Sequence, residues 1–150
     1  MSTTPTQESD CDIISTRTIN APRERIFAAF RDPKQLAQWW GPKDFRNTFH
    51  EFDFRPGGHW RFIMHGPDGT DYKNESVFLS ITEPERIVID HICPPYFRMT
   101  ITLEDQNGKT GITWHMRFQS AEVCASVRPI CVEANQQNFD RLEAVLNVKS

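Results

Sequence analysis

The alternation of apolar and polar residues between Arg46 and Phe118 constrains the fold of this 150-residue chain more than any other feature. Segments rich in β-branched and aromatic residues follow the period of two that is typical of strands. Short turns containing proline, glycine or asparagine separate them, and strands joined by short turns pair antiparallel. We therefore expect an antiparallel meander of six strands: 46–54, 58–65, 72–82, 86–92, 97–105 and 110–118.

The residues before this meander predict one more strand and two short helices. Segment 12–19 is rich in β-branched residues, which favour a strand. Asn20-Ala21-Pro22 then breaks the strand and begins a helix, because proline is well suited to a first helical turn. Asp32-Pro33 ends that helix and begins a second one, which carries Trp39-Trp40 and stops at Gly41-Pro42.

The C-terminal residues from Ser120 to Lys149 return to a helical pattern. Pro129 lies inside this pattern, and proline lacks the N–H that a helix interior needs. We therefore predict a short helix near 120–127, a break, and a long helix that runs to about residue 147.

The order of strand, two helices, six strands and long helix predicts an α+β fold with the helices on one face of an antiparallel sheet. A strongly twisted sheet of seven strands curls, and a helix laid across its concave side leaves a cavity. The length suits one domain, which we expect to span 11–150, after a polar tail at 1–10 that we expect to be disordered.

Composition and charge exclude several classes of protein. The aromatic content excludes a disordered chain, and no run of about eighteen apolar residues predicts a membrane span. A formal net charge of −3 and a pI near 5.9 argue against a nucleic-acid binder. The cysteines have no C-x-x-C spacing and no apolar leader precedes them, so we expect reduced thiols and a cytoplasmic protein: Cys11, Cys93, Cys124 and Cys131.

The aromatic surplus, eleven phenylalanines, four tryptophans and two tyrosines, is compatible with a thick core or with the wall of a cavity. Alternation places many rings and methionines on the face of the sheet that the helices cover. From the strands, the candidate cavity residues are Trp60, Phe62, Met64, Met99, Trp114 and Met116. From the long helix, the candidates are Asn135 and Phe139.

Two polar residues stand in the apolar rows of the predicted sheet. Glu75 shares its predicted face with Val77, Leu79 and Ile81, where a carboxylate would bind a polar group of a ligand or move a proton. His91 shares its face with Ile87 and Ile89. The alternatives are that Glu75 reaches water or pairs with a cation, and that His91 is a rim histidine beside Pro94-Pro95.

The pair Trp39-Trp40 also has two interpretations. One ring closes the core between the short helices and the sheet, or one ring closes the mouth of the pocket. The histidines and acidic residues show no H-x-x-x-H or H-E-x-x-H spacing, so the sequence predicts no metal site, and no motif indicates a cofactor.

Several motifs carry a resemblance to a known family. Residues 19–42 contribute Ile19-Asn20-Ala21-Pro22 and Trp39-Trp40-Gly41-Pro42, and residues 52–62 read FDFRPGGHWRF. Further matches are Gly66-Pro67-Asp68-Gly69, Tyr72, Asn74, Glu75, Phe78 and Pro84-Glu85-Arg86-Ile87-Val88. Over about residues 12–147 the chain resembles bacterial homologues of the C-terminal domain of the activator of Hsp90 ATPase.

This resemblance implies the START-like (SRPBCC, Bet v-like) helix-grip fold, in which a curved antiparallel sheet holds a long C-terminal helix. Many relatives have glycine where this chain has Ser76, and their C-terminal helix often opens with a Gly-Trp segment that is absent here.

Three functions follow as hypotheses. The first is a binding protein for a hydrophobic small molecule, with Trp39 or Trp40 closing the mouth and Glu75 and His91 as polar anchors. The second, implied by the resemblance, is an Hsp90-type co-chaperone. The third is a cyclase- or lyase-like enzyme that uses Glu75 and His91; it ranks below binding because no nucleophile, metal or cofactor motif is visible. The sequence leaves a homodimer open.

Overall fold

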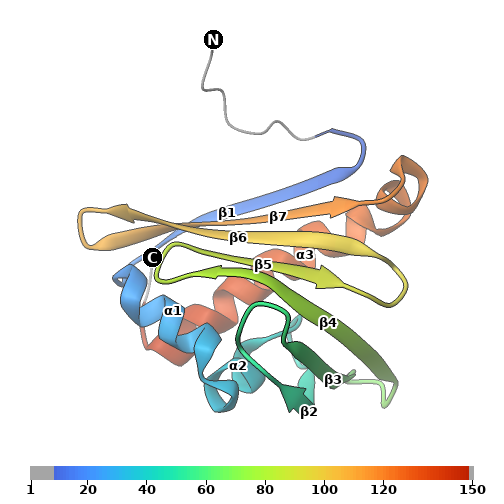
Figure 1. Cartoon of the computed structure of the whole chain (residues 1–150), viewed down its shortest axis with the longest axis horizontal. Helices are drawn as coiled ribbons and strands as arrows, with labels where there is room; N and C mark the ends of the chain where they lie inside the picture. Colours follow the sequence, from blue (N-terminus) through green and yellow to red (C-terminus); the bar gives the residue numbers. More distant parts are fainter. Residues whose placement is uncertain (1–8, 149–150) are drawn as a thin grey trace.

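A computed structural model describes residues 9–148 of the chain (Figure 1). The predicted tail therefore falls mostly outside the described residues. Within them the sheet consists of β1 (Asp12–Ile19), β2 (Arg46–Phe52), β3 (His59–His65), β4 (Asp71–Thr82), β5 (Arg86–His91), β6 (Phe97–Gln106) and β7 (Lys109–Phe118). The helices are α1 (Arg23–Arg31), α2 (Pro33–Trp39) and α3 (Ala121–Leu146).

The sheet is the predicted antiparallel meander, with one non-sequential pairing. Its strand order is β1-β7-β6-β5-β4-β3-β2, so β1 pairs with β7 and the edges are β1 and β2. All three helices lie on one face of the curved sheet, and α3 crosses that face next to β1 and β7 (Figure 1). The α+β helix-grip fold, with two short helices between the first two strands, is confirmed.

The C-terminal helix differs from its prediction, because α3 continues through Pro129 without a break. Ser120 caps it, and its Oγ accepts a hydrogen bond from the N–H of Val123 at 3.1 Å. The side chains that face the sheet keep the same helical phase on both sides of Pro129: Cys124, Val127, Cys131 and Asn135. Packing along this one face offsets the hydrogen bond that proline cannot donate.

Strand β4 also differs from its prediction, because a bulge between Phe78 and Ser80 shifts its register. Ile81 lies opposite Ile87 on the inner face, as predicted. Each residue before the bulge lies on the face of the sheet opposite to the one predicted. Phe78 and Ser76 are buried on the inner face. The predicted inner position of Glu75, together with Val77 and Leu79, is therefore wrong.

The packed end of the molecule is the region where α1, α2 and the last turns of α3 meet the sheet. Its core is made of large side chains that are fully buried: Phe27, Trp39, Phe78, Phe139 and Leu142. Close packing of such residues supplies most of the hydrophobic stabilisation of a domain of this size. None of the described helices is long and apolar enough to cross a membrane.

Candidate functional site

A pocket of about 250 Å³ lies between the inner face of the sheet and the middle of α3, and we call this region the hollow end. Strands β3 to β7 form its floor, and the loop after α2 forms one wall. The lining residues are Trp40, Gly41, Trp60, Phe62, Met64, Asn74, Ser76, Ile89, His91, Pro95, Phe97, Met99, Trp114, Met116, Cys131, Asn135 and Asn138.

Three tryptophans converge on the wall of this pocket. The ring of Trp40 lies 5.0 Å from that of Trp60 and 5.2 Å from that of Trp114, measured between centroids. Trp60 also stacks on Phe62 at 4.4 Å. Such close ring pairs favour tilted, edge-on and offset contacts.

Hydrogen bonds from α3 and β2 hold the loop that carries Trp40 in place. Arg141 of α3 donates to main-chain carbonyls of residues 38, 40, 41, 42 and 45. Asn47 donates to the carbonyl of Trp40 at 2.8 Å, and the N–H of Gly41 donates to Asn138 at 2.9 Å. Trp40 is therefore a fixed wall of the pocket in this structure.

Gly41 is the one position of this loop where glycine is required. Its φ of +102° is unfavourable for other residues, and a Cβ there would lie 2.7 Å from the terminal methyl of Met64. A side chain here would require the flexible end of Met64 to move, so the positive φ is the stronger constraint.

Two predicted pocket residues belong to the core instead. Trp39 is fully buried, and its indole N–H donates to the carbonyl of Ala29 at 3.1 Å. It packs edge-on against Phe30 at 4.8 Å, so it closes the core while Trp40 faces the pocket. Phe139 is also fully buried, 5.0 Å from the ring of Trp114, and it is not among the lining residues.

The indole N–H groups of Trp60 and Trp114 are buried and have no hydrogen-bond partner among the described residues. Both side chains are 1% exposed, and both line the pocket. Buried indole N–H groups usually find an acceptor, and leaving a buried donor unpaired costs about 1–3 kcal/mol. Two tryptophans that line the pocket therefore each carry a buried donor that no described residue satisfies.

Polar side chains line the pocket on both its sheet side and its helix side. Asn74 and Ser76 of β4 and His91 of β5 lie on the sheet side, and Asn135 and Asn138 lie on the helix side. Asn135 donates to Ser15 Oγ at 3.1 Å and approaches the sulfur of Met116 at 3.5 Å. The pocket is therefore apolar along its rings and polar where Asn74, Ser76 and His91 lie together, which we call the polar end.

His91 is held from both sides of its ring. Its Nδ1 lies 2.7 Å from the carbonyl oxygen of Pro95, and its Nε2 lies 2.9 Å from Oδ1 of Asn74. Phe97 stacks on the ring at 4.7 Å. Burial lowers the pKa of His91, although hydrogen bonds with the backbone of Pro95 and Cys93 oppose this. A pKa below the ordinary 6.5 favours the neutral form of the ring at pH 7.

Glu75, the second predicted polar anchor, lies on the outer face of the sheet. Its carboxylate accepts a hydrogen bond from Arg61 Nε at 3.1 Å, and its side chain is 39% exposed. The bulge in β4 is the physical reason, because it reverses the face of every earlier residue in the strand. The interpretation as a carboxylate paired with a cation describes Glu75 in this structure.

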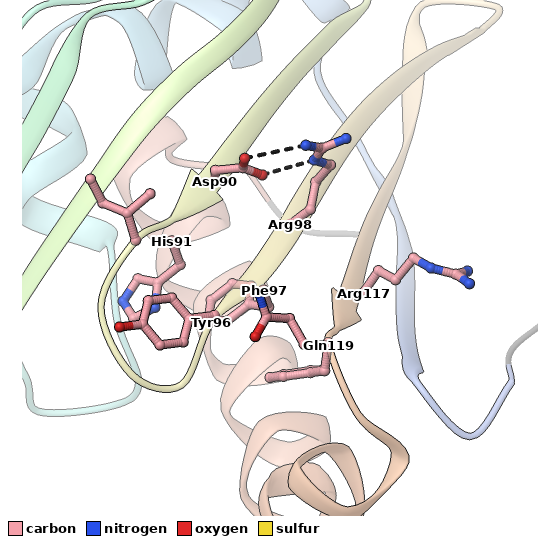
Figure 2. Close-up of a pocket in the computed structure, with 9 residues that line it drawn as sticks. Asp90, His91, Tyr96, Phe97, Arg98, Arg117 and Gln119 are labelled. Carbon is pink, nitrogen blue, oxygen red and sulfur yellow. Dashed lines mark hydrogen bonds and ion pairs between the residues drawn. The ribbon is translucent and has the colours of Figure 1, made fainter.

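A second pocket, of about 340 Å³, opens at the ends of β5, β6 and β7 (Figure 2). His91 and Phe97 line both pockets, so the stacked pair separates the two spaces. In Figure 2 the exposed ring of Tyr96 lies beside them, whereas Arg98 turns to Asp90, 2.8 Å away, on the outer face.

The structure places nine of the predicted residues around the main pocket: Trp40, Trp60, Phe62, Met64, His91, Met99, Trp114, Met116 and Asn135. Ile89 and Phe97 also line the pocket, and both lie on the inner face of the sheet, where alternation places them. Asn74 and Ser76 were missed because of the bulge. Cys131 and Asn138 were also missed, although their spacing from Asn135, by four and three residues, places all three on one helix face. No described group of three or more histidine, cysteine or acidic side chains is arranged to hold a metal.

A curved antiparallel sheet that holds a long C-terminal helix, with a pocket between them, defines a START-like helix-grip domain. Comparison with family models then identifies the branch of this class. The chain belongs to the family described as Activator of Hsp90 ATPase homolog 1-like protein, whose model matches residues 20–147. Both a ligand-binding and a co-chaperone-like role are consistent with this family. No curated protein matches the chain significantly in sequence.

Solved structures of other bacterial proteins have the same fold. A crystal structure of a Nitrosomonas europaea protein has a TM-score of 0.85 at 19% identity and covers 95% of this chain and 98% of its own. A solution structure of an Arthrobacter aurescens protein has a TM-score of 0.86 at 25% identity, covering 94% and 90%. The AHSA1-like protein from Aeromonas hydrophila has a TM-score of 0.74 at 18% identity, covering 89% and 92%.

Proposed function

We propose that this protein binds a small, mostly apolar molecule that contains a ring and a hydrogen-bond acceptor. The observation that carries the proposal is that Trp60 and Trp114, which line the pocket, each have a buried indole N–H without a partner among the described residues. A ligand oxygen that accepts from one of them would remove the cost of a buried, unpaired donor.

The size and lining of the pocket narrow the ligand further. Its volume of about 250 Å³ lies just below the roughly 300–1,000 Å³ of typical small-molecule sites. Such a site suits a compact molecule with one ring system rather than a long lipid chain. The rings of Trp40, Trp60 and Trp114 supply stacking and edge contacts to that ring.

The polar end supports a second contact with the ligand. Both ring nitrogens of His91 already have neighbours, the carbonyl oxygen of Pro95 at Nδ1 and Oδ1 of Asn74 at Nε2, so the ring forms a fixed polar surface at this end. The hydroxyl of Ser76, which lines the same end, both donates and accepts. A polar substituent of the ligand would therefore find partners at this end of the pocket.

Nuclear magnetic resonance of the indole N–H groups tests the proposal, because the chain has four tryptophans and each gives one signal. We expect acetophenone, which has a ring and a carbonyl acceptor, to move the Trp60 or Trp114 signal downfield in a saturable titration. Trp39 is the internal control, because its N–H already donates to Ala29. Ethylbenzene, of similar shape but without an acceptor, is the matched control ligand and should bind more weakly.

Trp60→Phe and Trp114→Phe keep a ring at each site but remove its N–H donor. We expect one of them to abolish the preference for acetophenone over ethylbenzene. Equal binding of the two ligands to the unaltered protein, or no saturable shift with either, would contradict the proposal. Glu75→Gln, on the outer face, is the matched control variant and should leave binding unchanged.

A further inference from the structure

A cysteine, a histidine and an asparagine meet where β5 leaves the sheet, at the edge of the main pocket. The Sγ of Cys93 lies 3.5 Å from Nε2 of His91, and Oδ1 of Asn74 lies 2.9 Å from the same nitrogen. The thiol also faces the carbonyl oxygens of Lys73 and Glu75 at 3.9 and 4.0 Å. The sequence does not suggest this cluster, because Asn74 comes from another strand.

The hydrogen bonds around His91 determine which of its nitrogens is basic. We assign the proton of the neutral ring to Nδ1, which lies 2.7 Å from the carbonyl oxygen of Pro95. Nε2 is then unprotonated, 2.9 Å from the Asn74 oxygen, which cannot donate to it, and 3.5 Å from the Cys93 thiol. Protonation of Nε2 relieves this unfavourable contact, so this nitrogen is basic. An unprotonated imidazole nitrogen beside a thiol is the arrangement of a general base with its nucleophile.

Asn74 is oriented so that it stabilises the ring after proton transfer. Its Nδ2 donates to the carbonyl of Tyr72 at 3.0 Å, which turns Oδ1 towards Nε2 of His91. When the thiol proton moves to Nε2, the new N–H donates to that oxygen. The imidazolium that forms would then donate from both nitrogens, to Pro95 and to Asn74.

We propose that Cys93 is a nucleophilic thiol, activated by His91 and Asn74, that forms mixed disulfides with small-molecule disulfides. Cys93 is partly exposed and lines a further pocket of about 510 Å³ on the outer side of β3 and β4, which gives such a molecule access. This site is separate from the tryptophan wall, so the proposal does not depend on the ligand proposed above.

The reaction balances without another oxidant. The thiol proton passes to Nε2 of His91, and the sulfur of Cys93 attacks one sulfur of the disulfide. The new Cys93 S–S bond forms as the old S–S bond breaks, so the Cys93 sulfur is oxidised and the leaving sulfur is reduced. The leaving thiolate takes up the proton from His91 and departs as a thiol.

Charged groups surround the cluster, but most are already paired. In the pocket of Cys93 the titratable or charged side chains are His50, Arg61, Lys73 and Glu75, and Arg61 pairs with Glu75 at 3.1 Å. On the far side of His91 the charged residues are Asp90, Arg98 and Arg117 (Figure 2). Asp90 pairs with Arg98 at 2.8 Å, and Arg117 lies 3.4 Å from Asp12.

The test is the pH dependence of the reaction with 4,4′-dithiodipyridine, followed by absorbance and by peptide mass spectrometry on the full-length protein. An ordinary thiol gains about tenfold in rate per pH unit below its pKa of roughly 8.5. We expect the rate at Cys93 to change less than about threefold between pH 6.5 and 8, because neutral His91 serves as the base throughout this range. Cys11, a second partly exposed thiol with no histidine partner among the described hydrogen bonds, is the internal control, and its rate should rise with pH more steeply than that of Cys93.

Variants then assign the effect to the cluster. Cys93→Ser should remove the fast phase, and His91→Gln should slow Cys93 at least tenfold at pH 6.5 while leaving Cys11 unchanged. Cys124 is buried, and burial raises the pKa of the Cys131 thiol, so neither should contribute to this phase. An ordinary pH slope at Cys93 of the unaltered protein, which needs no variant to fold, would overturn the proposal. An equal rate in the His91→Gln variant would overturn it as well.

Discussion

The two ends of the layer between sheet and helix differ in how they are filled, although both are lined by aromatic rings. At the packed end α3 presents large apolar side chains, Phe139, Leu142 and Leu146, and all three are buried. At the hollow end the same helix presents Cys131, Asn135 and Asn138, and a pocket of about 250 Å³ remains. The size and polarity of a few helix residues therefore decide whether this layer is core or cavity.

The comparison also separates two neighbouring tryptophans. Trp39 belongs to the packed end, with its N–H bonded to Ala29, and Trp40 belongs to the hollow end. Helix α2 ends between these two residues, so their rings have different surroundings. Arg141 holds the loop that follows by donating hydrogen bonds to the main-chain carbonyl groups of the loop. A substitution at the packed end should therefore change mainly the stability of the protein. A substitution at the hollow end should change mainly its binding of the ligand.

The largest effect is expected at the packed end. Phe139→Ala should lower the free energy of unfolding by about 3–5 kcal/mol, because it leaves a cavity in a fully buried site. Urea denaturation measures this loss. Met64→Ala, at the wall of the existing pocket, is the matched control and should cost less than about 2 kcal/mol. Equal losses would mean that the two ends are equally packed.

A smaller loss of stability is expected when the hydrogen bonds from Arg141 to the loop after α2 are removed. Arg141→Ala should lower the free energy of unfolding by about 2–4 kcal/mol, because several main-chain carbonyls lose a charged donor. The Trp40 indole signal should broaden as its loop gains freedom. Arg98→Ala, which breaks an exposed ion pair, is the control and should cost at most about 1 kcal/mol.

Filling the hollow end should change binding far more than stability. Ser76→Ile adds apolar volume on the inner face of β4, so acetophenone affinity should fall at least tenfold. The free energy of unfolding should change by less than about 1 kcal/mol, since the new side chain occupies existing space. Ser80→Ile, beyond the bulge and opposite Val88 on the outer face, is the control in the same strand. Undiminished affinity in the Ser76→Ile variant would show that the ligand binds elsewhere.

The smallest expected effect is on the pH dependence of stability, through His91 at the polar end. Burial lowers the pKa of His91 below its ordinary 6.5, so the unfolded chain binds a proton more readily than the folded one. The stabilisation from neutral His91 is therefore complete above about pH 6.5 and is lost as the pH falls below that value. Unfolding free energies measured between pH 7 and 5 should decline less steeply for His91→Gln than for the unaltered protein. Parallel pH profiles for the two proteins would argue against this environment for His91.

Most of the sheet was predictable because its determinants are local. Alternation correctly assigned the inner faces of β3, β5, β6 and β7, since these strands contain no bulge on that path. Alternation assigned the wrong faces in the first part of β4. Ile81 is on the inner face, but the bulge between Phe78 and Ser80 reverses the faces of the residues before it. Glu75 was consequently placed in the pocket, and Asn74 and Ser76 were overlooked.

The prediction for the C-terminal helix was wrong for the opposite reason. The local rule that proline interrupts a helix predicted a break at Pro129, but contacts with the sheet on both sides keep α3 continuous. Part of the pocket depends on that continuity, because Cys131, Asn135 and Asn138 follow the proline on a common face. Tertiary packing here outweighs a local preference of about 3 kcal/mol.

The sequence by itself determined the order of the elements, the antiparallel pairing and the apolar identity of most of the inner face, because periodicity and turn chemistry act over a few residues. Only the tertiary structure decided that the rings both fill a core and surround a pocket. It also decided that His91 rather than Glu75 faces this pocket, and that Cys93 lies beside His91. These outcomes depend on a bulge, on the rotation of α3 and on contacts between segments far apart in the chain.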